Sequence, residues 1–466
     1  MNQTKNEGLN ISVRSFLTAI IVILALMVAT YILTLTIPAG SYHRIADSNG
    51  NLLIDTQAGF TYVSGGIPFW KWLLSPVLVL GSSGSGTLIA VIVFLLVIGG
   101  VFSALDKCGL IAYILYRTAS RFSHVRYQLM TVVSLFFMGL GAMIGSFEEC
   151  VPLVPLVVAL SVKLGWDPLT GIGMSLLAAG CGFASGVCNP FTVGVAQQLA
   201  GLPMFSGVWM RMLSFVLIYA LLILFLRSYA KKIEKPVAAE TGIQFKRDPK
   251  MDRGMTAFVS ILGLGILIVL SSAFIPALQD YTMIIVAVMF LAAGITSVLL
   301  SGMTVTDLGK TFWGGIVGIF PAVLMILMAS SIKYTLEEAQ IMDTLLFRAV
   351  ELAESLPGWT VILFIYLMVL AMNFFIPSGS AKAFMLIPLI VPMAQIFGIS
   401  PQLCIVAFAF GDGFSNVFYP TNPALLIALG LADVSYGNWF RWSGKFQILN
   451  LLLTSLILLF GYVVGY

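Results

Sequence analysis

The chain has 466 residues, of which 59% are hydrophobic and 9% charged, with a formal net charge of +4 and a mean hydropathy of +1.02. A soluble domain carries about a quarter charged residues, so this composition excludes a soluble globular protein. Apolar runs of roughly eighteen residues or more recur, which predicts an all-α polytopic membrane protein rather than a β-barrel. The excess of Lys and Arg over Asp and Glu then indicates basic loops on the cytoplasmic side and not a nucleic-acid surface.

The first half of the chain, residues 1–229, is expected to enter the membrane several times. Its early elements are a span, a polar loop, an aromatic interfacial anchor and a second span, over 16–38, 39–68, 69–72 and 87–105. Residues 105–126 are apolar on one side and basic on the other, which predicts an amphipathic arm along the cytoplasmic interface. The only two histidines, His43 and His124, both fall in expected loops, which argues against a metal site.

A polar cluster interrupts the next apolar segment, 127–164. Ser146, Glu148 and Glu149 follow closely spaced glycines there. This pattern predicts a re-entrant hairpin, whose polar tip must lie against protein or water because lipid cannot satisfy it. Residues 167–201 are then expected to form a span broken at 186–190.

A basic segment separates the two halves. Residues 230–253 contain seven Lys or Arg residues and no apolar run, which predicts a cytoplasmic linker. An extra connecting helix over 254–280 supplies the odd crossing that an inverted second half requires. We therefore expect about nine spans plus two hairpins, with the N-terminus in the cytoplasm.

The second half, 281–466, repeats the order of elements in the first. Two spans, an arm, a hairpin, a broken span and a last span are expected over 281–301, 312–332, 336–354, 359–397, 400–430 and 438–464. The second arm is acidic where the first is basic, so the positive-inside bias puts the two arms on opposite sides of the membrane. This difference indicates an inverted-repeat secondary transporter with two hairpins and two broken helices.

The polar stretches of the two halves align at a constant offset. The matched positions are Pro155 and Pro388, Gly165 and Gly398, and Asn189-Pro190 and Asn422-Pro423. The charges do not match: Glu149 falls on Lys382, and Asp412 falls on Ala179. Any functional asymmetry between the halves is therefore expected at these positions.

The Asn-Pro pairs suit helices that break inside a membrane. Asn is a good N-cap, and Pro fits the first turn of the helix that follows. Such a break leaves N–H groups that attract carboxylates and carbonyls that can bind Na⁺. In each half we expect one tip and one break to form a pocket. The expected substrate-binding residues are Ser146, Glu148, Glu149, Asn189, Thr192, Ser378, Gly379, Ser380, Lys382, Thr421 and Asn422.

Asp412 lies inside an otherwise apolar span. A carboxylate there is costly to insert, which indicates a function, although it could instead form a helix-packing hydrogen bond. The expected ligands of a coupling ion, either Na⁺ or H⁺, are Asp412, Asn416, Asn189 and Asn422. No other cofactor is expected.

Three other charged positions leave alternatives open. Glu148 and Glu149 either line the site or lie in the headgroup zone. Lys382 contacts a substrate carboxylate, pairs with an acid or extends to the outer surface. Arg211 and Arg441, near the ends of late spans, are interpreted as interfacial anchors.

Five segments together resemble one known family. They are PAGSY, SFEE, CNPFT, PSGSAK and YPTNP, and they are similar to the YfcC/DcuC-like family of C4-dicarboxylate anaerobic carriers. The resemblance covers nearly the whole chain. It implies the inverted repeats of the ion-transporter superfamily, a scaffold and a moving transport domain, a homodimer and the bacterial inner membrane. Some members are described as basic amino-acid antiporters.

The sequence favours an ion-coupled or exchange transporter of a small carboxylate-bearing metabolite. The substrate would be an amino acid, including a basic one, or a C4-dicarboxylate. The alternatives are a dipeptide transporter and a passive anion or solute channel. A channel should show a continuous polar stripe, whereas polarity here is concentrated at two broken elements. An enzyme would need a catalytic dyad or metal motif, and the sequence contains no HExxH.

Overall fold

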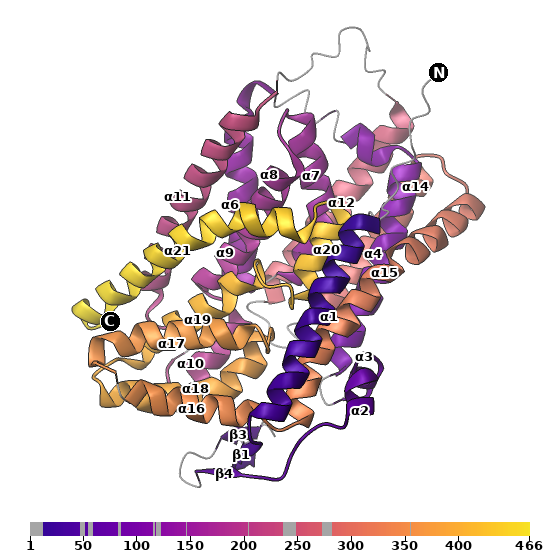
Figure 1. Cartoon of the computed structure of the whole chain (residues 1–466). Helices are drawn as coiled ribbons and strands as arrows, with labels where there is room; N and C mark the ends of the chain where they lie inside the picture. The colour runs from indigo at the N-terminus through magenta and orange to yellow at the C-terminus, as the bar shows by residue number, and fades with distance from the viewer. Residues whose placement is uncertain are drawn as a thin grey trace.

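The chain is mostly helical (Figure 1), because a segment surrounded by lipid can satisfy its backbone polar groups only within a helix or a closed barrel. The structure is a computed structural model that describes residues 13–46, 52–54, 59–82, 85–114, 117, 123–145, 147–203, 205–235, 248–272, 282–354 and 356–466. Among these residues, five helices are long and apolar enough to cross a membrane, or six if a bent pair counts as one span. The predicted nine spans and two hairpins stay a prediction.

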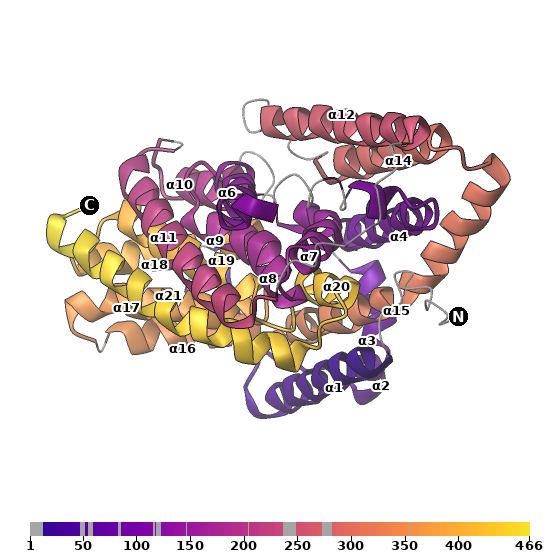
Figure 2. The same ribbon diagram turned by 90° about the horizontal axis from the view of Figure 1, so that it is seen from above.

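One group of helices forms a row (Figure 2). α12 and α14 lie side by side at one edge, α4 and α15 follow, and α1 lies at the opposite edge. α4 and α15 approach closely because Gly99 and Gly315 face each other: a Cβ on Gly315 would lie 2.3 Å from the Gly99 carbonyl oxygen. The bounds are α1 Val13–Thr36, α2 Phe69–Leu73, α3 Ser75–Leu78, α4 Ser85–Lys107, α12 Pro249–Ser272, α14 Thr282–Leu300 and α15 Val305–Glu338.

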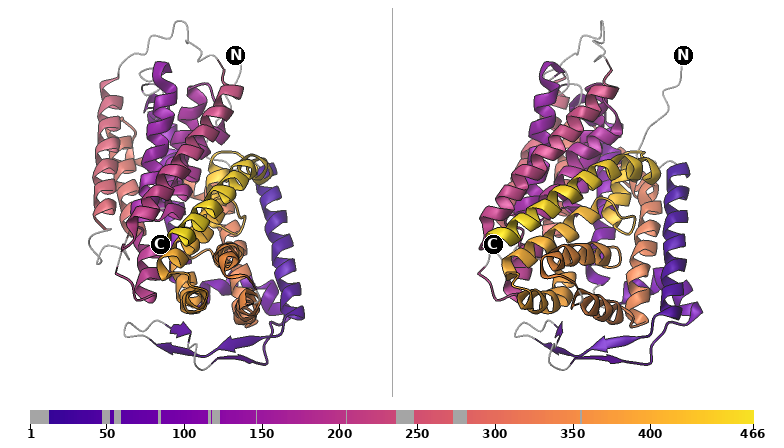
Figure 3. Two further views of the ribbon diagram at one scale, coloured as in Figure 1. Left: turned by 90° about the vertical axis from the view of Figure 1, so that its left-hand side faces the viewer. Right: turned by 60° about the vertical axis from the view of Figure 1, so that its left-hand side comes forward.

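The other group contains the elements expected to be hairpins and broken spans. Figure 1 shows α16, α17 and α18 stacked nearly parallel and lying across the direction of α6, α9 and α11, and Figure 3 (left) shows the same orange helices almost end-on. The bounds are α6 Arg126–Ile144, α7 Val154–Lys163, α8 Pro168–Ile172, α9 Ala178–Ser185, α10 Val195–Leu199, α11 Val208–Ile233, α16 Met342–Glu354, α17 Gly358–Asn373, α18 Gly379–Ile396, α19 Pro401–Asn416, α20 Pro423–Leu431 and α21 Tyr436–Val464.

The helices α9 and α19 cross at the centre of this second group. A Cβ on Gly413 of α19 would lie 2.3 Å from the Cα of Ala184 on α9, so the crossing needs a glycine. α6 packs against α9 in the same way: a Cβ on Gly141 would lie 2.1 Å from the carbonyl oxygen of Ala179. Small residues thus allow three backbones to meet without intervening side chains.

The two halves repeat several backbone turns at matching positions. The residues with positive φ after equivalent helices are Gly109 and Gln340, and Gly165 and Gly398. Asp167 caps α8 and Ser400 caps α19, each immediately before a proline. The second turn and the two caps recur at the offset that aligns the polar stretches, and the first turn lies within two residues of it. The orientation of the halves relative to a membrane, and hence the inverted repeat, stays a prediction.

The polar loop after α1 contains short strands that the sequence did not indicate. β1 (Gly40–Tyr42) pairs with β4 (Phe60–Tyr62), and β2 (Arg44–Ala46) pairs with β3 (Leu52–Ile54), both antiparallel. The loop is attached to α16 through the Asp343 carboxylate, which accepts hydrogen bonds from Tyr42 N at 2.9 Å and Arg44 Nη2 at 2.7 Å. Burial and this carboxylate raise the pKa of the Tyr42 hydroxyl to about 12.

The linker is shorter than the predicted 230–253. α11 continues to Ile233 and α12 begins at Pro249, so both ends of the predicted linker are helical. Lys231 and Lys232 lie in the last turn of α11, where cations interact favourably with the helix dipole. Residues 236–247 lie outside the described residues, as do 273–281, which include the end of the predicted connecting helix.

Two glycines on α6 test the close packing between α6 and α9. Gly141→Ala is expected to destabilise the protein by about 1–3 kcal/mol, because the new methyl group meets the Ala179 backbone. Gly139→Ala is the matched control, since its Cβ would have nothing within 4 Å. The measurement is the melting temperature of the purified protein in detergent. Equal melting temperatures for the two variants would contradict this packing.

Candidate functional site

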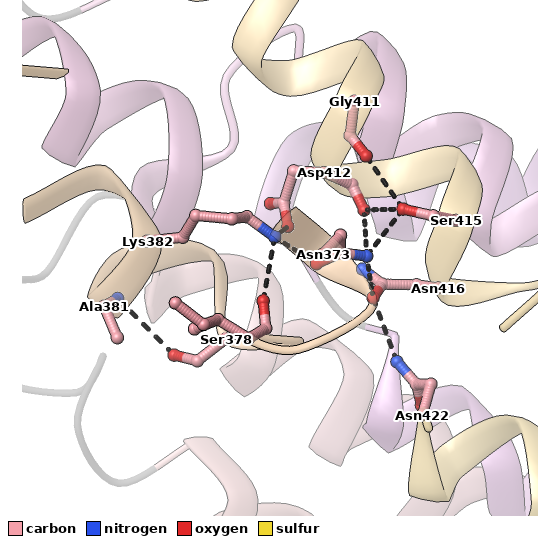
Figure 4. A network of polar contacts seen from close by, with 10 residues as sticks. Asn373, Ser378, Ala381, Lys382, Gly411, Asp412, Ser415, Asn416 and Asn422 are labelled. Carbon is pink, nitrogen blue, oxygen red and sulfur yellow. Dashed lines mark hydrogen bonds and ion pairs between the residues drawn. The ribbon is translucent and has the colours of Figure 1, made fainter. Parts of the chain in front are cut away.

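A buried ion pair lies where α18 and α19 meet (Figure 4). Lys382 Nζ is 2.7 Å from Asp412 Oδ1, and both side chains are fully buried. Among the ion pairs of the described residues, this is the one with both partners excluded from solvent. Of the alternatives that the sequence left open for Lys382, the structure shows pairing with an acid. A buried charge of this kind is tolerated only with a partner.

The Lys382 ammonium contacts two further oxygens. It donates to the backbone carbonyl of Ile376 at 3.1 Å and to the side-chain oxygen Oδ1 of Asn373. Ile376 lies in the turn between α17 and α18, where the helix has ended and the carbonyl is available. The ammonium is therefore surrounded by a carboxylate, an amide and a backbone carbonyl.

Asn373 was not predicted from the sequence. Its Nδ2 lies 3.0 Å from the Asp412 carbonyl oxygen, 2.6 Å from Ser415 Oγ and 2.9 Å from Asn416 Oδ1. The amide thus connects the end of α17 with the last turn of α19. The signal available in the sequence was a single asparagine at the end of an apolar run, just before the polar PSGS segment.

The network continues to the second break. Asn422 Nδ2 donates to Asn416 Oδ1 at 3.0 Å, while Asn422 Oδ1 accepts hydrogen bonds from the backbone N–H groups of Ala424 at 2.9 Å and Leu425 at 3.4 Å. Asn422 is thus the N-cap of α20, with Pro423 at the first helical position. The Asn422 side chain already occupies the N–H groups that were expected to attract a substrate carboxylate.

At the first break an asparagine side chain likewise accepts a hydrogen bond from the backbone of the turn that follows. α9 ends at Ser185, and a wide helical turn, η5 (Pro190–Gly194), begins after a short irregular segment. Asn189 Oδ1 accepts a hydrogen bond from the Thr192 backbone N–H at 3.3 Å. Gly145, at the end of α6 with φ +78°, lies against this amide, and a Cβ there would be 2.3 Å from Asn189 Oδ1. Ser146 lies outside the described residues.

Gly379 brings the two halves together. A Cβ on this first residue of α18 would lie 2.5 Å from Thr192 Cγ2 and 2.6 Å from Asp412 Oδ2. The second tip therefore fits between the first break and the buried carboxylate, in a space that admits no side chain. The residues expected to form two separate half-sites are contiguous here.

The first tip also reaches the other half. Glu148 lies in a tight turn, η3 (Glu148–Leu153), and lines a cavity of about 20 Å³ with Ala424 and Ile427 of α20. The cavity has room for about one water molecule. The Glu148 and Asp412 carboxylates are near enough to repel each other when both are charged. Both glutamates are half-buried against protein rather than fully exposed.

Several polar atoms around this centre have no hydrogen-bond partner within the part of the chain that the structure describes. They are Thr192 Oγ1, Thr421 Oγ1, Asp412 Oδ2 and Glu149 Oε2, all of them buried. Buried polar groups are normally satisfied, and exceptions need an explanation. These unpartnered groups are candidates for contact with a polar ligand.

Other predicted positions lie at the edge of the centre or are used differently. Ser378 is exposed and caps α18 by accepting a hydrogen bond from Ala381 N at 3.5 Å. Ser380 is half-buried in the first turn. The interpretation of Arg211 as an interfacial anchor is wrong: its side chain is fully buried, and Nε donates to the Val187 carbonyl, beside the first break. Arg441 is exposed.

The described residues contain no group of three His, Cys, Asp or Glu side chains that could hold a metal ion. The helices long enough to span a bilayer, together with a polar centre enclosed among broken helices, define a multi-pass membrane protein.

The chain belongs to the DcuC family of C4-dicarboxylate anaerobic carriers, whose family model matches residues 16–463. One relative, from Escherichia coli K12, is named "Putative basic amino acid antiporter YfcC"; it is 29% identical over 416 residues, which cover 83% of this chain and 80% of the relative. An uncharacterized protein of Haemophilus influenzae is 25% identical over 384 residues, covering 79% and 74%. The protein is therefore a membrane transporter.

Two solved transporter structures are similar over most of their length. The YdaH transporter of Alcanivorax borkumensis has a TM-score of 0.44 and 18% identity, covering 97% of this chain and 99% of YdaH. MtrF of Neisseria gonorrhoeae, from a class of antimetabolite efflux pumps, has a TM-score of 0.45 and 16% identity, covering 95% and 94%. The family assignment rests on the sequence match.

Removing one partner of the buried ion pair is expected to destabilise the protein more than replacing both. Lys382→Met or Asp412→Leu alone leaves one buried charge unpaired, which costs about 3–5 kcal/mol. The double variant carries no charge and keeps apolar side chains of similar size. Its melting temperature is expected to exceed those of both single variants. A double variant no more stable than either single variant would contradict a direct interaction.

Proposed function

We propose that this protein is a secondary active transporter of a small carboxylate-bearing metabolite in the bacterial inner membrane. The observation that carries the proposal is the polar centre, within the part of the chain that the structure describes, at which both broken spans and both tips meet among apolar helices. Polar groups inside a membrane protein commonly mark the pathway of a substrate or ion. Family membership supports transport without chemical change of the substrate.

The substrate would bind to polar groups of the tips and the two breaks, and the second tip would have to separate from the first break to admit it, because no side chain fits between them here. The hydroxyl groups of Thr192 and Thr421 can donate to a carboxylate, and Glu149 can accept from an amino group. The N-terminus of α20 favours negative charge, and a carboxylate there would replace the cap made by Asn422. An amino acid, including a basic one, uses both kinds of partner, whereas a C4-dicarboxylate uses the donors only.

A coupling ion would be held by Asp412, Asn416, Asn189 and Asn422, with H⁺ or Na⁺ as the candidates and exchange of two substrates as the alternative. The name of the Escherichia coli relative supports exchange of basic amino acids. The repeated turns at matching positions support two related halves that alternate access to the centre. The family resemblance supports a homodimer.

Counterflow in proteoliposomes tests the proposed function. Vesicles that contain the protein are loaded with excess unlabelled arginine, ornithine, succinate or a dipeptide, and a trace of the labelled compound is added outside. A carrier is expected to accumulate label transiently and saturably for one substrate class. A channel would only equilibrate the label, and that result, or a lack of uptake for every carboxylate, would contradict the proposal.

Thr192→Val and Thr421→Val test the location of the substrate. Each change removes a hydroxyl that makes no described hydrogen bond while it preserves shape, so the melting temperature is expected to stay close to the original. Loss of one hydrogen bond to the substrate should raise KM about 3- to 10-fold. Thr311→Val, at another buried and unpartnered hydroxyl on α15, is the matched control. Unchanged KM in both site variants would put the substrate elsewhere.

A further inference from the structure

We propose that the centre contains a monovalent-cation site that is filled by the chain's own Lys382 ammonium. The three oxygens around Nζ come from the Asp412 carboxylate, the Asn373 amide and the Ile376 carbonyl. Carboxylate, amide and backbone carbonyl oxygens are hard ligands of the kind that coordinate alkali and alkaline-earth cations in proteins. The lysine supplies the same single positive charge from within the polypeptide.

The position of the lysine explains why the site needs no free cation. Lys382 lies in the first turns of α18, directly after the tip, and its side chain passes through the interior to the end of α19. The side chain is fully buried, so it excludes an ion from the same oxygens. With the ammonium in place, the charge of Asp412 is balanced. A Na⁺ ion added at these oxygens would meet the ammonium and be repelled.

The surrounding network orients the Asn373 side chain, which supplies one of the three oxygens, independently of the lysine. Asn373 is oriented by its contacts with Asp412 O and Asn416 Oδ1, and Asn416 is in turn fixed by Asn422. Glu148 interacts electrostatically with Asp412 from the other tip but is not among the described contacts of Nζ. Removal of the lysine side chain should therefore leave a negatively charged cage of oxygens that a Na⁺ ion can enter.

Occupation of the cation position by Lys382 also affects transport, a point that rests on the proposed function. If Lys382 occupies the cation position, no Na⁺ ion binds at Asp412, and of the coupling modes proposed above H⁺ or exchange with a second substrate remains. The cation cage itself does not depend on the substrate. Its test is therefore a stability measurement, which remains informative even if no transported compound is found.

The test compares melting temperatures of the purified full-length protein in NaCl and in choline chloride at equal ionic strength. The unaltered protein is expected to melt at the same temperature in both salts. Lys382→Ala should melt lower in choline, because Asp412 loses its partner, and should be raised saturably by Na⁺, by about 2 °C or more. Lys382→Ala combined with Asp412→Asn should lose the response to Na⁺. Lys333→Ala, at a partly exposed lysine of α15, is the control for loss of positive charge.

Each result decides the matter. Recovery of folded Lys382→Ala in NaCl but only aggregate in choline would support the cage. Aggregation of Lys382→Ala in both salts would overturn it, because Na⁺ then does not replace the ammonium. A folded Lys382→Ala whose melting temperature does not change with Na⁺ would overturn it for the same reason. A saturable Na⁺ response of the unaltered protein equal to that of the variant would also overturn it. In proteoliposomes, substrate uptake by the unaltered protein is expected to be equal in NaCl and in choline chloride.

Discussion

The buried contact between Lys382 and Asp412 is the constraint on which the arrangement of the centre depends. A carboxylate and an ammonium excluded from water stabilise each other only if both are held close together. That requirement brings the first turns of α18 to the last turns of α19. It also explains why the end of α17 carries an asparagine, since Asn373 is in reach of both charged residues.

The small residues around the pair make this proximity possible. Gly379 lets the second tip lie against the Asp412 carboxylate and the first break at once, and Gly413 lets α19 cross α9 at backbone distance. A bulkier residue at either position would separate the halves. The polar centre is thus a product of close backbone packing as much as of the polar side chains, and both tips contribute to it.

Local chemistry made part of this site predictable, whereas contacts between distant residues did not. Asn189 and Asn422 were expected at helix breaks because Asn-Pro has a fixed local meaning, and both asparagines accept hydrogen bonds from the helical turns that follow. The partner of Lys382 was left open among three alternatives, because Asp412 lies on another helix. Arg211 was misjudged because its position near the start of a helix says nothing about what covers it.

The asymmetry between the halves has a structural basis. At the offset that aligns the two polar stretches, Asn373 falls on Leu140, Asp412 on Ala179 and Lys382 on Glu149. The ion pair and its amide therefore belong to the second half alone. The first half supplies Thr192, its capping asparagine and two half-buried glutamates. The two halves thus have related local structures but contribute different polar groups to the same centre.

The most direct measurement of the central claim is counterflow by the charge-free double variant Lys382→Met/Asp412→Leu in proteoliposomes. If the ion pair serves transport, a double variant that is folded, monodisperse and thermally stable should lose counterflow of the substrate that the unaltered protein carries. If the pair only joins α18 to α19, the same preparation should transport at the original rate. That second result would contradict the account.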